Sequence, residues 1–122
     1  MTSFTFVVCA EPYKYEAIDT VLNLSEAIIE KGHEITGIFF YGSGVYNIKE
    51  KIIKDSSIRN LSLRLEKFCN SHDIEFSACS TWTSFTGIKS EEFVEGANQE
   101  GLGSLSLMAS KSDKVIFFGP GG

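Results

Sequence analysis

The sequence is poor in cations and has no long apolar segment. It contains 11 Lys and Arg against 16 Asp and Glu, so its formal net charge is −5. This balance argues against direct binding of nucleic acid, because phosphate contacts depend on clustered Lys and Arg. No apolar run approaches the roughly 18–20 residues that a membrane-spanning helix needs. The uninterrupted apolar runs are short, as at residues 115–118. We therefore expect a protein that neither spans a membrane nor binds nucleic acid directly.

Cysteine and histidine are also scarce. Three cysteines (Cys9, Cys69 and Cys79) without regular spacing do not make a disulfide framework. There is no Cys-x-x-Cys pair, and His33 and His72 lie just after predicted helices, so we expect no metal site. The N-terminus has no basic region ahead of its first apolar stretch, which is typical of a strand. This predicts that there is no signal peptide and that the protein is cytoplasmic.

Strands and helices alternate along the chain. The length of 122 residues and the hydrophobic fraction of 43% fit a single domain over residues 1–122. Short apolar runs predict strands at residues 3–9, 34–41, 73–78 and 113–118. Apolar residues at helical spacing predict helices at about 16–31, from 58 onward behind possible capping residues at 55–57, and at about 104–110. The less regular segments are a weakly helical stretch at 45–54, a polar and aromatic loop at 80–87, and a short helix beginning at Ser90. This alternation predicts an α/β fold with a mostly parallel sheet and helices on both faces.

The three cysteines differ in their predicted places. Cys79 ends the third predicted strand, and in open α/β sheets the functional sites lie at the carboxyl ends of the strands. We expect it near solvent, where a following helix N-terminus can favour the thiolate. A small buried residue that closes the strand is the alternative, and the residues alone leave both open. Cys9 is expected in a buried strand with Glu11 nearby, and Cys69 lies on an apolar helix face, so core packing is the better interpretation for both.

Two further patterns suggest ligand binding less specifically. The glycines of Gly101–Gly103 precede a helix, but the full G-x-G-x-x-G pattern is missing, and a tight turn is the better interpretation. Six aromatic residues are expected at the same sheet edge: Tyr13, Tyr15, Tyr41, Tyr46, Trp82 and Phe85. They are suited either to the wall of a flavin or nucleotide site or to a buried subunit interface.

Several short motifs follow one another in a fixed order along nearly the whole chain. They are Glu11-Pro12-Tyr13, Glu30–Ile35 followed by Gly37–Tyr41, Gly44-Val45 with Asn47, Cys79 with Gly87-Ile88 eight residues beyond it, Gly96–Asn98, and Gly101–Gly103 with Leu105. In this order and spacing the chain resembles the DsrE/TusD family of small sulfurtransferase subunits. The resemblance implies a three-layer α/β/α domain with a five-stranded parallel sheet and no cofactor.

The same resemblance implies a role in sulfur relay. Cys79 matches the family's sulfur-carrying cysteine, which holds sulfane sulfur as a persulfide. We expect Ser80, Thr81, Trp82 and Gly87 to form the supporting loop. The resemblance also implies a homo- or hetero-oligomer with paralogous DsrF/DsrH- or TusC/TusB-like subunits, and a DsrC/TusE-like acceptor protein. The family serves both sulfur oxidation and tRNA 2-thiouridine formation, and the resemblance is compatible with either process.

The chain departs from the family pattern near the predicted site. Phe85-Thr86 stands where the family has two arginines before the glycine that is Gly87 here, and the segment between Asn98 and Gly101 is short. These differences motivate an alternative, a scaffold subunit that keeps the fold without efficient chemistry. A flavin- or nucleotide-binding protein is the third hypothesis, suggested by the fold type and the aromatic residues.

Overall fold

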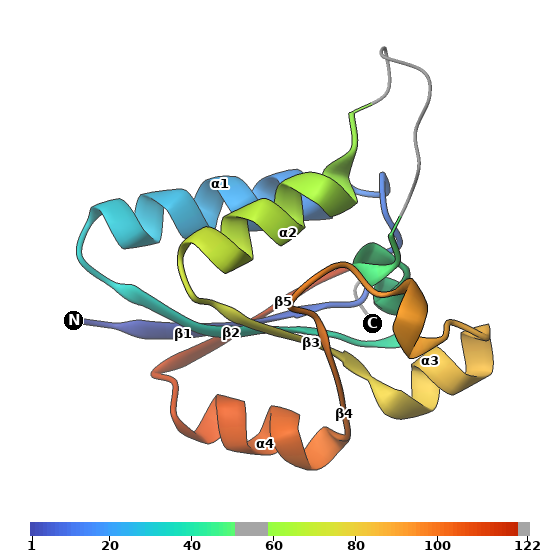
Figure 1. Ribbon diagram of the computed structural model, residues 1–122. Coiled ribbons are helices and arrows are strands. Elements are labelled where there is room, and N and C mark those ends of the chain that lie inside the picture. Colours follow the sequence, from blue (N-terminus) through green and yellow to red (C-terminus); the bar gives the residue numbers. More distant parts are fainter. Residues whose placement is uncertain (51–58, 120–122) are drawn as a thin grey trace.

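Five parallel strands form one sheet in the computed structural model, which describes residues 1–50 and 59–119 (Figure 1). The order is β4-β3-β2-β1-β5, and each neighbouring pair is parallel. The strands are β1 (Ser3–Val8), β2 (Glu34–Phe40), β3 (Glu75–Cys79), β4 (Asn98–Glu100) and β5 (Lys114–Phe118). The expected parallel, five-stranded α/β architecture is confirmed.

Helices cover both faces of this sheet. Figure 1 shows α1 (Ala17–Glu30) and α2 (Leu61–Ser71) on one face and α4 (Leu102–Ser110) on the other. The short helix α3 (Ser80–Thr86) lies beyond the carboxyl ends of the strands. Two 3-10 helices, η1 (Gly42–Ile48) and η2 (Ser90–Glu92), complete the described elements. Within the described ranges, no helix has the length and apolar character required to cross a bilayer.

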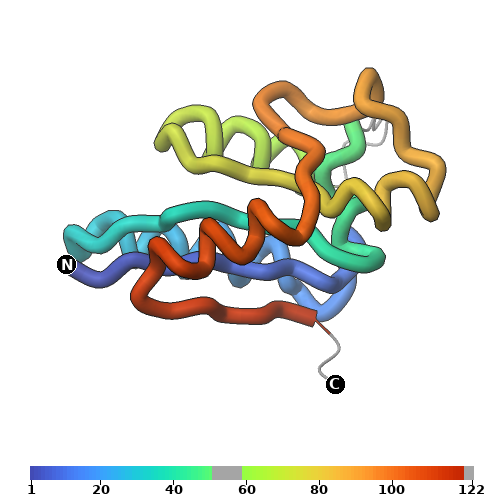
Figure 2. Tube along the Cα trace, turned by 90° about the horizontal axis from the view of Figure 1, so that it is seen from below, coloured from blue at the N-terminus to red at the C-terminus, as the bar shows by residue number. Residues whose placement is uncertain are grey.

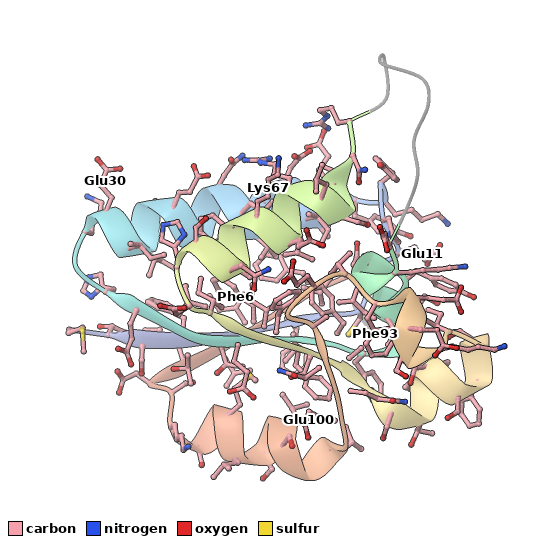
Figure 3. The ribbon with its side chains drawn as sticks, viewed as in Figure 1. Phe6, Glu11, Glu30, Lys67, Phe93 and Glu100 are labelled. Atoms are coloured by element: carbon pink, nitrogen blue, oxygen red, sulfur yellow. The ribbon has the colours of Figure 1, made fainter. Side chains whose placement is uncertain are left out.

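The main core lies between the sheet and the pair α1 and α2. Alternate residues of a strand point to opposite faces, so Phe6 and Val8 of β1 face these helices, and both are fully buried (Figure 3 labels Phe6). On the other face, Met108 of α4 packs against β2 where Gly37 has no side chain. The loop end of the sheet is fixed by Asn47 of η1, whose side-chain amide donates to the backbone oxygen of Ala10.

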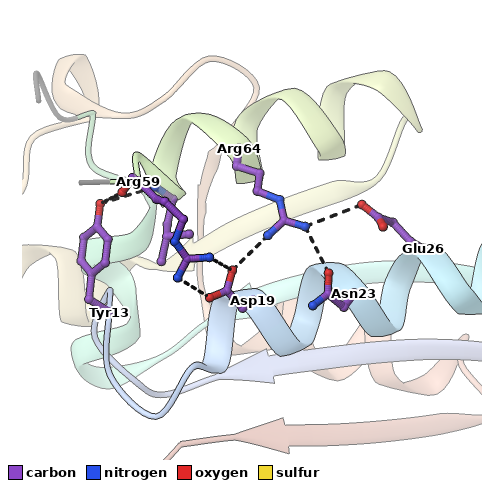
Figure 4. A network of polar contacts seen from close by, with 7 residues as sticks. Tyr13, Asp19, Asn23, Glu26, Arg59 and Arg64 are labelled. Carbon is purple, nitrogen blue, oxygen red and sulfur yellow. Dashed lines mark hydrogen bonds and ion pairs between the residues drawn. The ribbon is translucent and has the colours of Figure 1, made fainter. Parts of the chain in front are cut away.

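Polar contacts join α1 and α2 on the surface. Asp19 of α1 pairs with Arg59, just before α2, at 2.8 Å, and with Arg64 of α2 at 3.0 Å (Figure 4). Arg64 also donates to Asn23. The Tyr13 hydroxyl donates to the backbone oxygen of Arg59. These contacts fix the start of α2 against the loop that follows β1.

Several elements differ in kind or in bounds from their sequence predictions. The expected loop at 80–87 is helix α3, and the third strand continues one residue to include Cys79. Strand β4 was not predicted from its polar residues. Helix α2 begins at Leu61, with the Asn60 side chain accepting from the Leu63 N–H. The capping residues expected at 55–57 and the later part of the predicted segment 45–54 lie outside the described residues. The short helix expected at Ser90 is confirmed as η2.

Candidate functional site

Cys79 lies where β3 ends and α3 begins. It is the last residue of β3 and the N-cap of α3, with an extended backbone conformation. This confirms its position at the carboxyl end of the third strand. The expectation that it lies near solvent is wrong, because only 1% of its surface is exposed. In place of an open loop, the chain folds into α3, which contacts η1, β3 and β4.

A buried threonine fastens α3 to the neighbouring strand. Thr83 is fully buried, and its hydroxyl donates to the backbone oxygen of Ser80 at 2.9 Å. The Thr83 hydroxyl oxygen also accepts a hydrogen bond from the Gln99 side-chain amide of β4 at 2.8 Å. The helix then ends at Gly87, whose φ of 74° lies in the left-handed region that glycine adopts without strain. All four predicted supporting residues therefore belong to α3 or its C-cap: Ser80, Thr81 and Trp82 lie in the helix, and Gly87 ends it.

Three of the predicted aromatic residues form a continuous series beside Cys79. Trp82 meets Tyr41 edge to face, with ring centroids 5.8 Å apart, and meets Phe85 in the same way at 5.5 Å. Phe85 is 72% exposed, so the series runs from the end of β2 out to solvent. Tyr13 lies elsewhere, at the start of α2, where it contacts Arg59. The six aromatic residues are thus not one cluster, and Thr81 of the predicted loop is exposed on the outside of α3.

A carboxylate shares the sheet face of Cys79. Cys79 and Glu100 are register partners in the parallel pair of β3 and β4. Register partners of neighbouring strands project to the same face of a sheet. Glu100 lies between β4 and α4 in Figure 3, and its side chain accepts a hydrogen bond from the Ser104 hydroxyl of α4 at 3.0 Å. Sequence reasoning missed this residue because nothing in Asn98–Glu100 predicted a strand.

The other two cysteines are placed less favourably for chemistry. Cys69 is fully buried in α2, and desolvation raises the pKa of its thiol to about 12. This confirms its interpretation as a core residue. Cys9 lies just past the end of β1 and is only half-buried, so its placement inside a buried strand is wrong. Burial nevertheless raises the pKa of the Cys9 thiol.

The histidines and the glycine pair have local structural contacts. His33 accepts a hydrogen bond from the Thr2 N–H at its Nδ1, and His72 packs on Phe68 at 4.5 Å between ring centroids. No group of three or more His, Cys, Asp or Glu side chains in residues 1–50 and 59–119 is arranged to hold a metal ion. Gly101 is the N-cap of α4, as a turn into that helix requires.

Comparison with known proteins agrees with the resemblance seen in the motifs. Residues 2–118 match the model of the DsrE/DsrF-like family. The chain belongs to this family. Two relatives support the assignment over nearly their full lengths. One, from Vibrio vulnificus (strain YJ016), is named Sulfurtransferase TusD homolog; it is 27% identical, with 94% of this chain and 96% of the relative covered. The relative named DsrE from Allochromatium vinosum is 25% identical, with 95% and 98% covered.

Solved structures show the same fold. The crystal structure of the ychN protein from E. coli has a TM-score of 0.82 at 22% identity, covering 97% of this chain and all of that chain. The MTH1491 protein from Methanobacterium thermoautotrophicum has a TM-score of 0.67 at 15% identity, covering 96% of this chain and 99% of that chain. The DsrE/DsrF-like chain described here therefore has the expected three-layer fold, with Cys79 at the carboxyl edge of its sheet.

Proposed function

We propose that this chain is a sulfur-relay subunit that carries sulfane sulfur as a persulfide on Cys79 and passes it to a cysteine of a partner protein in the cytoplasm. The observation that carries the proposal is the position of Cys79 at the junction of β3 and α3, in a member of the DsrE/DsrF-like family. The carboxyl edge of a parallel sheet is the usual location of sites in open α/β folds. The names of the relatives support sulfur transfer as the reaction.

The reaction consists of two exchange steps without net oxidation. The Cys79 thiol first loses its proton to solvent, and its Sγ then attacks the terminal sulfur of a donor persulfide. A new S–S bond forms on Cys79, the S–S bond of the donor breaks, and the donor leaves as a thiolate that takes up a proton. An acceptor thiolate then attacks the terminal sulfur of the Cys79 persulfide, and Cys79 leaves as a thiolate. Each step follows the logic of thiol–disulfide exchange.

The other cysteines fit this role poorly. Thiolate is the reacting form, so the raised pKa values of Cys69 and Cys9 lower the reactive fraction at neutral pH. Cys69 is also fully buried within α2, away from the strand ends. No Cys-x-x-Cys pair exists in the sequence, so no second cysteine close in sequence can resolve the persulfide. The acceptor cysteine comes from another protein.

The partners of this reaction follow from the family. We propose a DsrC/TusE-like acceptor and paralogous subunits of the DsrF/DsrH or TusC/TusB kind, in sulfur oxidation or in tRNA 2-thiouridine formation. The acceptor has to approach the α3 end of the sheet. There it meets the exposed ring of Phe85, in place of the paired arginines expected of the family.

Intact-mass analysis after incubation with a sulfane-sulfur donor tests the proposal. We expect the wild-type chain to gain the mass of one or more sulfur atoms, and Cys79→Ser to gain none. Cys9→Ser and Cys69→Ser are the matched controls, and both should load like the wild type. Circular dichroism should show that all three variants are folded. Equal gain in wild type and Cys79→Ser, or no gain in either, would refute the carrier role.

The burial of Cys79 favours one alternative function, a scaffold subunit. A thiol that is 1% exposed cannot meet a donor until the residues that cover it move, and a subunit without sulfur chemistry has no need of that movement. In that case Cys79→Ser leaves both assembly with partner subunits and the activity of the complex unchanged. In the carrier case assembly is kept and sulfur transfer is lost.

A further inference from the structure

A buried hydroxyl close to Cys79 has no hydrogen-bond partner. Ser77 of β3 is fully buried, and its Oγ forms no hydrogen bond with any of the described residues. An unpaired buried hydroxyl costs free energy, so such groups are few in native structures and each calls for an explanation. Ser77 stands two residues before Cys79 on the same strand, and this position indicates what the hydroxyl could bind.

The side chains of Ser77 and Cys79 project to the same face of the sheet. Alternate residues of a strand point to one face, so Glu75 at the start of β3 shares that face with them. Glu75 lines a small cavity together with Ser104 and Met108 of α4. The shared face is therefore the one that α4 covers, and Figure 2 shows α4 lying across the sheet. The hydroxyl and the thiol thus lie in line on one face of one strand.

The thiol of Cys79 does not itself reach the hydroxyl of Ser77. A strand rises about 3.2–3.4 Å per residue, so side chains two residues apart are separated by roughly 6.4–6.8 Å along it. No hydrogen bond joins the two residues. A persulfide adds a second sulfur about 2.05 Å beyond Sγ, since that is the length of an S–S bond. Rotation about χ1 of either residue moves its end along the strand. The terminal sulfur of a loaded Cys79 can therefore reach a hydroxyl that the bare thiol cannot.

We propose that the Ser77 hydroxyl is the hydrogen-bond partner of the sulfane sulfur on Cys79 and holds this sulfur inside the closed subunit. The inference rests on the proposed carrier function of Cys79. A serine hydroxyl has one donor and two acceptor lone pairs, so it can pair with the terminal sulfur whether that sulfur is protonated or ionised. The residues that cover Cys79 move to admit the donor, as the burial of the thiol requires, and then close over the loaded sulfur.

Two polar residues of the neighbouring strand are less suited to this role. Asn98 and Glu100 of β4 are the register partners of Ser77 and Cys79, so they project to the same face. Asn98 is exposed, and water can satisfy its amide. The carboxylate of Glu100 accepts a hydrogen bond from Ser104, and its negative charge repels an ionised persulfide. The buried, neutral hydroxyl of Ser77 is therefore the better partner for a sulfur carried on Cys79.

This hydrogen bond acts on the loaded subunit and leaves the unloaded one unchanged. It favours the closed state of the loaded subunit, and a typical intramolecular hydrogen bond corresponds to a factor of about two to ten in a population. Small reductants and free thiols therefore reach the carried sulfur less often. The bare thiol makes no such bond, so Ser77 does not affect its access to solvent. A difference between the release of sulfur and the reactivity of the unloaded thiol is the signature of this role.

The test measures sulfur release and thiol alkylation in the wild type and in Ser77→Ala. Chains loaded on Cys79, as checked by peptide mass spectrometry, are mixed with cyanide. The cyanide carbon bonds to the terminal sulfur, the S–S bond breaks, thiocyanate is released and Cys79 remains as a thiolate. We expect thiocyanate to form about two- to tenfold faster from Ser77→Ala, because the loaded state has lost one hydrogen bond. Alkylation of Cys79 in the unloaded variant should keep the wild-type rate.

Ser25→Ala is the matched control. Ser25 of α1 is also fully buried, and its hydroxyl likewise has no hydrogen-bond partner among the described residues. It lies in a helix on the other face of the sheet from α4 (Figure 1). The same chemical change there should leave both rates at the wild-type values. Circular dichroism should show that both variants are folded.

Each outcome decides for or against the role of Ser77. Faster release from Ser77→Ala with unchanged alkylation supports it. Equal release from loaded wild type and loaded Ser77→Ala refutes it and leaves the carrier function of Cys79 intact. A rise in both release and alkylation also refutes it, since Ser77 then supports the packing around Cys79 and does not bind the sulfur. If the wild type takes up no sulfur on Cys79, the carrier function itself is refuted, and the role of Ser77 with it.

Discussion

Cys79 is buried and α3 begins directly after it, so we predict that opening of α3 controls the reactivity of this thiol. The contact of α3 with β4 includes the hydrogen bond from Gln99 to the buried Thr83 hydroxyl, at 2.8 Å. Gln99→Ala removes this hydrogen bond and leaves the bond from Thr83 to the Ser80 oxygen in place. We therefore expect the open state, in which Cys79 meets solvent, to become more populated.

The size of this change follows from the strength of the hydrogen bond. A typical intramolecular hydrogen bond contributes about 0.5–1.5 kcal/mol to stability. Because Gln99 is exposed, we assign its hydrogen bond to Thr83 to the lower half of this range, about 0.5–1 kcal/mol. Since about 1.4 kcal/mol corresponds to a factor of ten, the open population should rise about two- to fivefold. If closing is faster than chemical modification, the modification rate of Cys79 rises by the same factor.

The assay is alkylation of the native protein, with each cysteine followed by peptide mass spectrometry. Asn98→Ala is the matched control, because Asn98 is an exposed residue of the same strand. It should leave the Cys79 rate unchanged. The half-exposed Cys9 should react at the same rate in all three proteins and serves as an internal standard. Equal Cys79 rates in wild type and Gln99→Ala would show that α3 does not control access to this thiol.

Two further predictions concern stability. A Cβ at Gly44 would overlap the backbone oxygen of Val8, so Gly44→Ala should lower the free energy of unfolding by about 1–3 kcal/mol in urea titrations, while Gly103→Ala, which meets open space, should not lower it. Hydrogen bonds from the backbone N–H and the hydroxyl of Ser3 lower the pKa of Asp113 in the folded state. The ionised carboxylate therefore stabilises the fold at pH values above its unfolded pKa. This stabilisation is lost as the pH falls through the folded pKa. Asp113→Ala should therefore lower the melting temperature at pH 7, and the difference from wild type should shrink below about pH 4; a difference that stays constant down to pH 2 would contradict this.

The regular part of the fold was predictable because its pattern is local. The apolar runs of β1, β2 and β5 and the helical spacing of α1 appear in the sequence itself. Strand β4 could not be found in this way, since Asn98–Glu100 has none of the residues that favour strands. It forms because its backbone completes the ladder beside β3, which is a property of the assembled sheet.

The site was predicted correctly in position and wrongly in environment. The alternation of strands and helices placed Cys79 at a strand end, and the structure confirms that position. Residues 80–86 are all serine, threonine or aromatic residues, which favour helix only weakly, so a loop was expected. The hydrogen bonds of Thr83 and the ring contacts of Trp82 hold this segment as a helix, and these tertiary contacts cannot be read from local propensity.

The two edges of the sheet are unequal, and this limits how copies of the chain can polymerise. Edge β4 has three residues, Asn98–Glu100, all polar, so it offers a poor template for an added strand. Edge β5 has five residues and is strongly apolar. A subunit in which both edge strands can pair with another copy can add copies without limit and form a fibre. A subunit with only one such edge has no free edge left once it has paired. If copies of the chain paired through their strand edges, growth of the sheet would therefore stop at two copies, joined through β5.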